Sequence, residues 1–286
     1  MHEKTFHGVA EWIELLRSMG GVSGKVEVVL RYIAAHPQYS SYASVRDIAA
    51  QCSVSMGTVT RAARAVGFSG WTPFQEEIRA TYISSLSARE VSEQRAQDHQ
   101  YASYSWLLND RKNLNAYVNS VDPTALVSIA RAIHQSDRTM VVADGSYAGI
   151  GQILAHTSSL YGYDVRLLGG RNNVSNSVAH LTSSDLIVAI NFWKINRTSR
   201  HVLEACQEKG VRVVLIGEDP SVAKRFNVEF LRIPTESVGF SPSMIVALSV
   251  VQSIVAELAA IDPDRSMHML GLAEAEWDRF GDIPRG

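Results

Sequence analysis

Ser44–Phe68, SVRDIAAQCSVSMGTVTRAARAVGF, predicts a short helix, a tight turn and a second helix. The apolar residues of its first part have the i, i+3, i+4 spacing of a helix with one buried face, which predicts a helix over 45–51. The turn occupies 52–54. Ser55 then stands at the N-cap position, where its hydroxyl can accept a hydrogen bond from an unpaired backbone N–H of the second helix. Gly67 ends that helix.

The second helix of this stretch has two different faces on a wheel of about 100° per residue. One face is small and apolar and consists of Val59, Ala62, Ala63 and Val66. The other face presents Gly57, Thr60, Arg61 and Arg64. A bare glycine permits close approach, and hydroxyl and guanidinium groups can bind phosphates or base edges in the major groove of DNA. The pattern favours a DNA-binding helix-turn-helix; the alternative is an ordinary αα-hairpin with solvated arginines.

The composition bounds the classes of protein that the chain can belong to. Its 286 residues, 46% of them hydrophobic, can form two domains with packed cores. The net charge is −2, so a nucleic-acid surface must be a local basic patch, and dimerisation would double it. Cys52 and Cys206 each lie in an apolar helical pattern, which predicts two buried thiols and no disulfide. The histidines form no HExxH or Cys/His cluster, so no metal is expected.

No membrane segment is predicted. No window approaches ~18 uninterrupted apolar residues, the length that a membrane-spanning helix needs. The first residues, 1–21, contain acidic side chains and lack the apolar core of a signal peptide. We therefore expect a soluble, cytoplasmic protein without a membrane partner.

The hydrophobic pattern divides the chain into four parts. Residues 1–84 predict an all-α helix-turn-helix domain, 85–121 a linker and connecting helix, and 263–286 a tail with a short helix. In 122–262 short β-branched runs alternate with helices, which predicts an α/β domain with a mostly parallel sheet between helices. The expected strands are 139–143, 165–168, 186–190, 211–216 and 228–233. The expected helices of this part are 123–134, 150–161, 199–209 and 243–260.

Small and polar residues follow the first predicted strand. Gly145, Ser146 and Tyr147 form a turn before a helix, and such a turn can offer backbone N–H groups and a hydroxyl to an anion. Tight packing of the helix on the sheet is the alternative reason for small residues here. The turn is not a GxGxxG fingerprint, and no acidic residue lies in a convincing ribose-binding position. A nicotinamide cofactor is therefore not expected.

Large and cationic residues follow the third predicted strand, namely Asn191, Trp193, Lys194 and Arg197. Parallel sheets bind ligands at the carboxyl ends of their strands. Lys194 and Arg197 can neutralise a phosphate or carboxylate there, and Trp193 can stack on a ring. The alternative is a subunit interface, where Trp and Arg are also enriched.

Three further polar residues precede the last helix of the predicted sheet domain. Ser241 and Ser243 complete the predicted ligand-binding set, and Glu236 is the best candidate for a catalytic base. A solvated loop carboxylate is the more common role for such a glutamate. The helix at 243–260 is apolar on nearly all sides, so we expect it to be buried in its domain or in a dimer seam.

The order of these parts resembles the RpiR/MurR family of bacterial transcription regulators, in which a helix-turn-helix domain precedes a SIS (sugar isomerase) domain. The most specific match is the helix-turn-helix, at Val54, Ser55, Thr58, Val59, Arg61, Arg64, Gly67 and Phe68. Ser53 replaces the usual turn glycine, which we expect to be tolerated because a left-handed conformation is optional there.

The resemblance implies a regulator, not an enzyme, that binds a double-stranded DNA operator as a homodimer or homotetramer and senses a small molecule, usually a phosphosugar. Its DNA-binding set comprises Ser55, Gly57, Thr58, Thr60, Arg61 and Arg64. No cofactor is implied.

The second half departs from the family's phosphosugar motifs. Residues 143–147 replace a Gly-x-Gly-x-Ser turn, and 191–199 replace a Ser-x-Ser-Gly-x-Thr run. We therefore expect the effector to be a carbohydrate derivative or another anionic metabolite. Two other interpretations stay open: a sugar-phosphate isomerase with a helical appendage, and a regulator whose second domain serves only for dimerisation.

Overall fold

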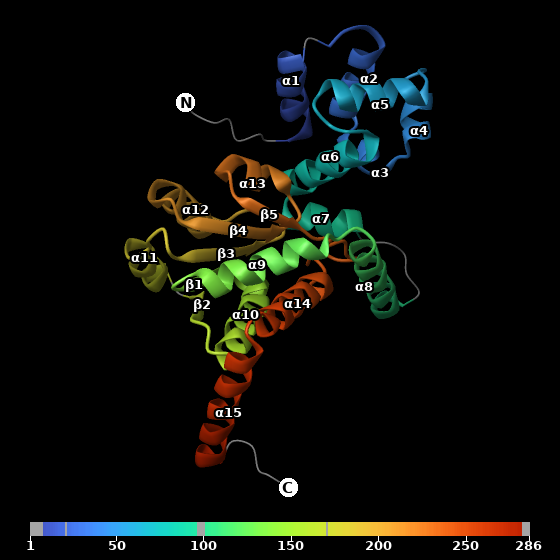
Figure 1. The fold of residues 1–286 in the computed structure, drawn as a ribbon. Helices are drawn as coiled ribbons and strands as arrows, with labels where there is room; N and C mark the ends of the chain where they lie inside the picture. Colours follow the sequence, from blue (N-terminus) through green and yellow to red (C-terminus); the bar gives the residue numbers. More distant parts are fainter. Residues whose placement is uncertain (1–7, 21, 96–100, 170, 282–286) are drawn as a thin grey trace. The chain divides into compact units, whose positions relative to one another are not determined.

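The computed structural model describes residues 8–20, 22–95, 101–169 and 171–281 (Figure 1). The chain divides into two compact units, Met1–Ala96 and Gln97–Gly286. The first unit is helical and the second contains a parallel sheet covered by helices. The predicted fold class is therefore confirmed. The predicted connecting segment 85–121 is shared between the units, since one of its helices falls in each of them.

The first unit packs its helices around apolar side chains that are fully buried, among them Ile13, Leu30, Ile48 and Phe74. One helix ends at Ala35, and Pro37 opens the next one because proline is well suited to the first helical position. The helices are α1 (Val9–Gly20), α2 (Gly24–Ala35), α3 (Pro37–Tyr42), α4 (Val45–Gln51), α5 (Met56–Ala65), α6 (Trp71–Ser85) and α7 (Ala88–Arg95).

The second unit is built on five strands that are all parallel, in the order β2-β1-β3-β4-β5. The strands are β1 (Thr139–Ala143), β2 (Val165–Leu168), β3 (Leu186–Asn191), β4 (Arg212–Gly217) and β5 (Glu229–Arg232). The helices are α8 (Ala102–Val118), α9 (Pro123–Gln135), the 3-10 turn η1 (Gly145–Tyr147), α10 (Ala148–Leu160), α11 (Arg171–Ala179), α12 (Arg197–Lys209), α13 (Pro220–Phe226), α14 (Ile245–Ile261) and α15 (Pro263–Phe280).

Alternate residues of the strands form two apolar cores, one on each face of the sheet. Val141, Val188 and Val214 pack with helices α9, α10 and α14. On the opposite face, Val142 and Ile187 pack with α11, α12 and α13 (Figure 1). The central strands β1, β3 and β4 are almost entirely buried and hydrophobic because both faces of the sheet are covered, whereas the edge strands β2 and β5 expose charged side chains such as Arg166 and Glu229.

Helix α14 is buried in its domain, as expected, although Gln252 and Ser253 give it one exposed polar side. It contributes seven buried side chains to the first of these cores: Val246, Ala247, Val250, Val251, Ile254, Val255 and Leu258.

Three helices of this unit differ from the sequence prediction. The tail was expected to hold a short helix, but α15 spans 18 residues, begins with Pro263 and is capped by Asp262, whose carboxylate accepts a hydrogen bond from the N–H of Arg265. Helices α11 and α13 were not predicted. Helix α13 has the same kind of start, at Asp219 and Pro220, as α9 has at Asp122 and Pro123. Its seven residues are too few to show a helical period.

Among the described residues, no single helix has both the length and the apolar composition for a membrane span. Helices α14 and α15 meet that test only as a pair, which is bent by 108° at its junction.

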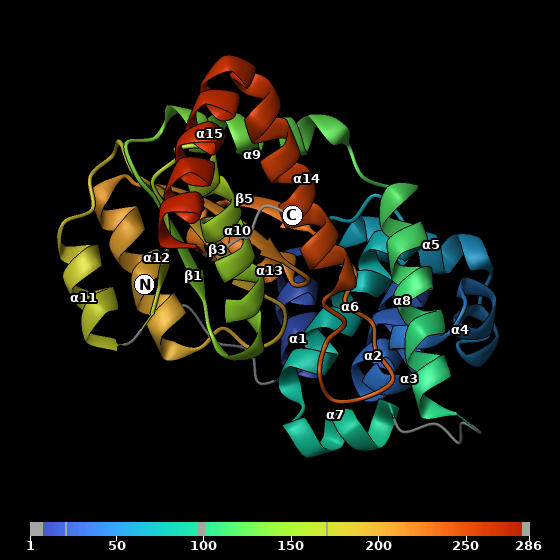
Figure 2. The same ribbon diagram turned by 90° about the horizontal axis from the view of Figure 1, so that it is seen from below.

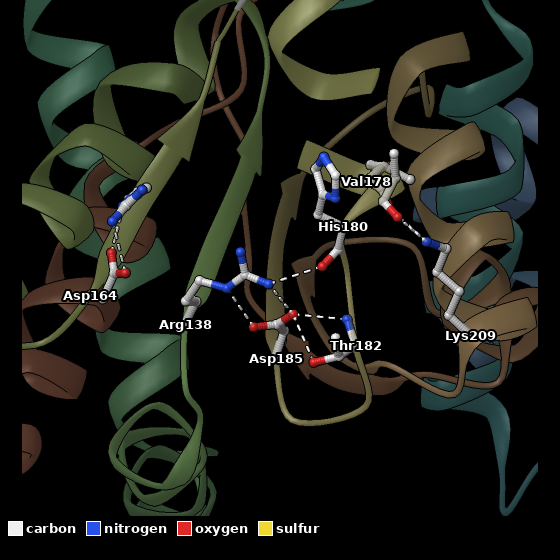
Figure 3. A network of polar contacts seen from close by, with 9 residues as sticks. Arg138, Asp164, Val178, His180, Thr182, Asp185 and Lys209 are labelled. Atoms are coloured by element: carbon white, nitrogen blue, oxygen red, sulfur yellow. Dashed lines mark hydrogen bonds and ion pairs between the residues drawn. The ribbon is translucent and has the colours of Figure 1, made fainter. Parts of the chain in front are cut away.

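An ion pair joins the amino ends of β1 and β3 (Figure 3). The guanidinium of Arg138 donates two hydrogen bonds to Asp185, at 2.9 and 2.7 Å, and a third to the carbonyl of His180 at 3.0 Å. The N–H of Thr182 donates to the same carboxylate at 2.8 Å. Burial alone would raise the pKa of Asp185, but the hydrogen bonds from Arg138 and Thr182 outweigh it and lower that pKa. The network therefore joins β1 and β3 at their amino ends, opposite to the carboxyl ends at which the ligand site is predicted.

Candidate functional site

Helices α4 and α5 form the predicted helix-turn-helix, and both have a serine cap. Ser44 and Asp47 make a capping box at α4, in which each side chain accepts a hydrogen bond from the backbone of the other. Ser55 accepts a hydrogen bond from the N–H of Thr58 at 3.3 Å and so caps α5. In the turn, Ser53 has φ 52°, so the left-handed conformation expected to be optional is in fact used. A serine accepts it at a cost that the usual glycine would avoid.

Helix α5 has the two faces that the wheel predicts. Val59, Ala62 and Ala63 are fully buried, and Val66 is 9% exposed. The opposite face holds exposed Gly57, Arg61 and Arg64 and half-buried Thr60. The Nε of Arg64 donates a hydrogen bond to the carbonyl of Ser69 at 3.2 Å, which ties this side chain to the end of its helix.

Thr58 does not lie on the exposed face, although the resemblance placed it in the DNA-binding set. Thr58 is only 2% exposed. Its Oγ1 accepts a hydrogen bond from Nη2 of Arg61 at 3.0 Å and lies 3.0 Å from the hydroxyl of Ser55. The structure therefore makes Thr58 a support for Arg61, because a buried hydroxyl cannot reach a partner outside the protein.

The carboxyl ends of β1 and β3 lie side by side at the point where the strand order reverses, which is the usual ligand position in such sheets. We call residues 144–147 and 191–196 the strand-end site. Its two halves are joined by a hydrogen bond from the side-chain amide of Asn196 to Asp144. The oxygen of the same amide accepts the N–H of Ser199 at 2.8 Å and caps α12.

The predicted residues at the end of β1 lie at the surface of the strand-end site. Gly145 and Ser146 are exposed, and Gly145 has φ 58°, which a side chain would disfavour. Tyr147 is half-buried, and its ring meets Phe192 edge-on with the centroids 4.9 Å apart. Ser146 is therefore available to a ligand, whereas Tyr147 also contributes to packing.

The predicted residues at the end of β3 contact one another and one further loop. The side-chain amide of Asn191 donates to the carbonyl of Trp193 at 3.2 Å. The ring of Trp193 meets Phe240 edge-on at 5.3 Å, and Nζ of exposed Lys194 lies 5.0 Å from the Trp193 ring centroid. This aromatic group brings the connection between β5 and α14 to the strand-end site.

Two of the predicted residues lie on that connection and have different surroundings. Ser241 is exposed. Ser243 is completely buried, and its hydroxyl donates a hydrogen bond to Asp110 at 2.6 Å. The prediction that Ser243 binds the ligand is therefore corrected, since its donor is used inside the protein. Glu236, the candidate base, is half-buried.

Arg197 is exposed and lines a groove of about 530 Å³ between α11 and α12, together with Ser175, Thr198, His201 and Lys209. Of the predicted ligand-binding residues, it is the one that contributes to this groove.

Within the described residues, no three His, Cys, Asp or Glu side chains gather as a metal site would require. Cys206 is buried, and burial raises the pKa of its thiol to about 12.

Sequence reasoning missed several residues of this region. Asp144 and Asn196 lie within 143–147 and 191–199, the two stretches that replace the family's motifs. Asp144 could have been noticed as an acidic side chain at a strand end, and Asn196 as a capping amide at the start of a helix. Phe240 and Asp110 carried no such signal, because their partners Trp193 and Ser243 are far away in the sequence.

Comparisons with known proteins agree with both units. Residues 23–85 match the model of the helix-turn-helix domain of the rpiR family. The sugar isomerase domain of an RpiR transcription factor from Sphaerobacter thermophilus is 27% identical, with a TM-score of 0.57 over 62% of this chain and 99% of that one. NanR of Vibrio vulnificus, in complex with ManNAc-6P, is 18% identical and shares the fold over 94% of this chain and 98% of its own, with a TM-score of 0.55. No curated protein matches the chain.

The chain is therefore a DNA-binding transcription regulator with an N-terminal helix-turn-helix and a C-terminal sugar isomerase fold. Its first unit contains a helix-turn-helix domain of the rpiR family, and its second unit is similar to the sugar isomerase domain of an RpiR transcription factor, so the resemblance that the sequence indicated is confirmed.

Proposed function

We propose that the protein binds its operator as a homodimer through α5 and that a small effector at the strand-end site changes this binding. The exposed face of α5, with Gly57, Arg61 and Arg64 opposite a buried apolar face, carries the first part of the proposal. A helix with a bare glycine and two guanidiniums can enter the major groove and grip phosphates or guanine. Because the chain is nearly neutral, two copies on two half-sites would supply the phosphate contacts that one copy lacks.

The strand-end site supports a carbohydrate derivative or another anionic metabolite as the effector. Ser146, Lys194 and Ser241 are exposed around the carboxyl ends of β1 and β3 and can bind hydroxyl or anionic groups. The solved complex of NanR with ManNAc-6P supports a sugar-derived ligand on this fold. In this chain, however, Asn196 already caps α12 and is held by Asp144. We therefore assign the anionic part of the effector to the cationic side chains of Lys194 and Arg197 and not to the backbone N–H groups at the start of α12.

The proposal is tested by binding of the purified protein to genomic fragments from around its own gene, at a stated salt concentration, with and without pooled metabolites. We expect one fragment to bind specifically and one metabolite pool to change its affinity. The matched variants are Lys194→Ala and Arg197→Ala, which should abolish the metabolite effect while leaving binding without metabolite unchanged.

Failure to bind any fragment specifically, in any pool, would overturn the regulatory proposal. Turnover of a sugar phosphate that disappears in Glu236→Ala would instead establish the isomerase alternative. An operator that is bound but never affected by any metabolite would indicate that the second unit serves only for dimerisation.

A further inference from the structure

The connection between β5 and α14 is attached to helix α8 by side chains from one face of that helix. We call residues 234–243 the effector loop, because its Phe240 packs on Trp193 of the strand-end site. The side-chain amides of Asn109 and Asn113 both donate to the carbonyl of Glu236, the second at 2.7 Å. Figures 1 and 2 both show this loop running beside α8.

Two further contacts attach the same loop to α8. The carboxylate of Asp110 accepts the hydroxyl of Ser243 at 2.6 Å. Gly239 packs so closely on the ring of Trp106 that a Cβ at this glycine would lie 3.3 Å from it. Positions i, i+3, i+4 and i+7 of a helix lie close to one face. The four residues of α8 that contact the loop have this spacing, namely Trp106, Asn109, Asp110 and Asn113. One face of α8 therefore contacts the loop near its start, its middle and its end.

The loop is also attached to the sheet. The hydroxyl of Thr235 donates to Glu218, which follows β4, at 2.5 Å. Within the loop, the N–H of Ser243 donates to the carbonyl of Thr235 at 3.0 Å, which joins the two ends of the loop. Together with the contact between Phe240 and Trp193, these bonds connect the ends of β3 and β4 to α8 through the effector loop. The loop that contacts Trp193 at the strand-end site is thus the same loop that is hydrogen-bonded to α8.

The polar contacts with α8 are energetically significant because they are shielded from water. Asn113 is 2% exposed, and Ser243 is completely buried. A buried amide or hydroxyl that loses its partner cannot recover the lost bond from water, so these groups favour one arrangement of helix and loop.

We propose that Asn109, Asp110 and Asn113 are positioning residues that couple the effector loop to α8, and through α8 to the DNA-binding unit. This inference rests on the proposed function. Helix α8 is the first element of the second unit, so the chain that leads to the helix-turn-helix enters at its N-terminus. An effector that prefers one arrangement of the loop must then change operator affinity, and operator binding must change effector affinity by the same factor.

The test uses the full-length Asn109→Ala/Asn113→Ala variant and two measurements: hydrogen exchange of the amides of 234–243 and 102–118, and operator affinity at fixed salt. We expect exchange in the loop to rise and the operator affinity to change by about fivefold or more, the low end of measured allosteric couplings. Asn115→Ala is the matched control, because Asn115 is exposed on the same helix. Asp110→Asn keeps the acceptor for Ser243 and should behave like the unmodified protein, whereas Asp110→Ala should not.

Faster exchange in the loop with unchanged operator affinity would overturn the coupling while leaving the proposed function intact. Absence of an operator for the unmodified protein would overturn the proposed function itself, so the two failures are distinguishable. If the double variant does not fold, Ser243→Ala breaks the same attachment from the side of the loop, and its exchange and operator affinity decide the question in the same way.

Discussion

Arg61 donates a hydrogen bond from its Nη2 to Oγ1 of Thr58, at 3.0 Å, within the first turns of helix α5. The acceptor is buried and the donor is on the exposed face. A residue inside the domain therefore orients a residue on the predicted DNA-binding surface. Because Thr58 also contacts the cap residue Ser55, the start of the helix and the direction of Arg61 are set together.

Replacing Thr58 by Val removes this support without a large change in volume. We expect operator affinity to fall by about tenfold, since the loss of one charge-assisted hydrogen bond costs roughly 1.5 kcal/mol. Circular dichroism should show that the helices are retained. Gln38→Ala, at an exposed position of α3, is the control and should bind as the unmodified protein does. Equal affinity of the Thr58 variant would mean that Arg61 does not need this orientation.

The two arginines of α5 should contribute to DNA binding through contacts with phosphates or with bases, and these two kinds of contact can be distinguished by measurement. We expect Arg61→Ala and Arg64→Ala each to weaken operator binding, and a variant that loses a phosphate contact should reduce the slope of log affinity against log salt by about 1. A variant that loses a base contact should instead relax the preference for one operator position. Titrations at several salt concentrations distinguish the two. Unchanged specific binding of both variants at fixed salt would refute the assignment of this face.

The ion pair between Arg138 and Asp185 should stabilise the second unit at neutral pH. The pKa of Asp185 is lowered in the folded protein, so its contribution is complete above the pKa of an unfolded aspartate, about 3.9, and disappears as the pH falls through the lower folded value. Asp185→Asn should cost about 1.5 kcal/mol of unfolding free energy at pH 7, less than for a fully buried pair, because the side chain of Arg138 is 35% exposed and water screens its charge.

Urea unfolding at several pH values measures this effect. The difference between the unmodified protein and Asp185→Asn should be constant from pH 8 to 5 and should shrink below about pH 4. The matched control is Asp164→Asn, whose ion pair with Arg166 is more exposed and should contribute less than about 1 kcal/mol (Figure 3). A difference for Asp185→Asn that grows as the pH falls would contradict the sign of this prediction.

Gly217, the last residue of β4, allows the backbones of β3 and β4 to approach closely beside the strand-end site. A Cβ at this position would lie 2.6 Å from the backbone oxygen of Asn191, which cannot move without disturbing the sheet. Gly217→Ala should therefore lower the unfolding free energy by about 1–3 kcal/mol, the usual cost of overpacking. Gly169→Ala is the control, because a Cβ there meets nothing within 4 Å. Thermal unfolding of both variants tests the difference, and equal stabilities would show that the strands adjust freely.

Local chemistry explains why most of the fold could be predicted. Ser55 and Asp122 are caps whose effect depends only on their immediate neighbours, and in the structure both side chains accept a hydrogen bond from a backbone N–H of the following turn. The β-branched runs at 139–143 and 165–168 became strands with those bounds. The full length of α15 could not be predicted with the same success, because its polar composition obscures the helical period beyond its cap.

The candidate site was only partly predictable. The carboxyl ends of β1 and β3 were predicted from the alternation of strands and helices, so the placement of Ser146 and Lys194 near these strand ends followed from sequence position alone, while their role in binding stays a prediction. Burial decided the rest. Thr58 and Ser243 have the residue types of a binding site, but both are buried and donate or accept inside the protein.

The sequence by itself determined the helix-turn-helix, the two faces of α5 and the parallel sheet, because caps, turns and hydrophobic periods act between residues a few positions apart. Only the tertiary structure decided that Asp144 is joined to Asn196 and that Asp110 accepts the hydroxyl of Ser243. These partners are 52 and 133 positions apart, and their contact depends on how whole elements pack on one another. No spacing in the sequence encodes such a contact.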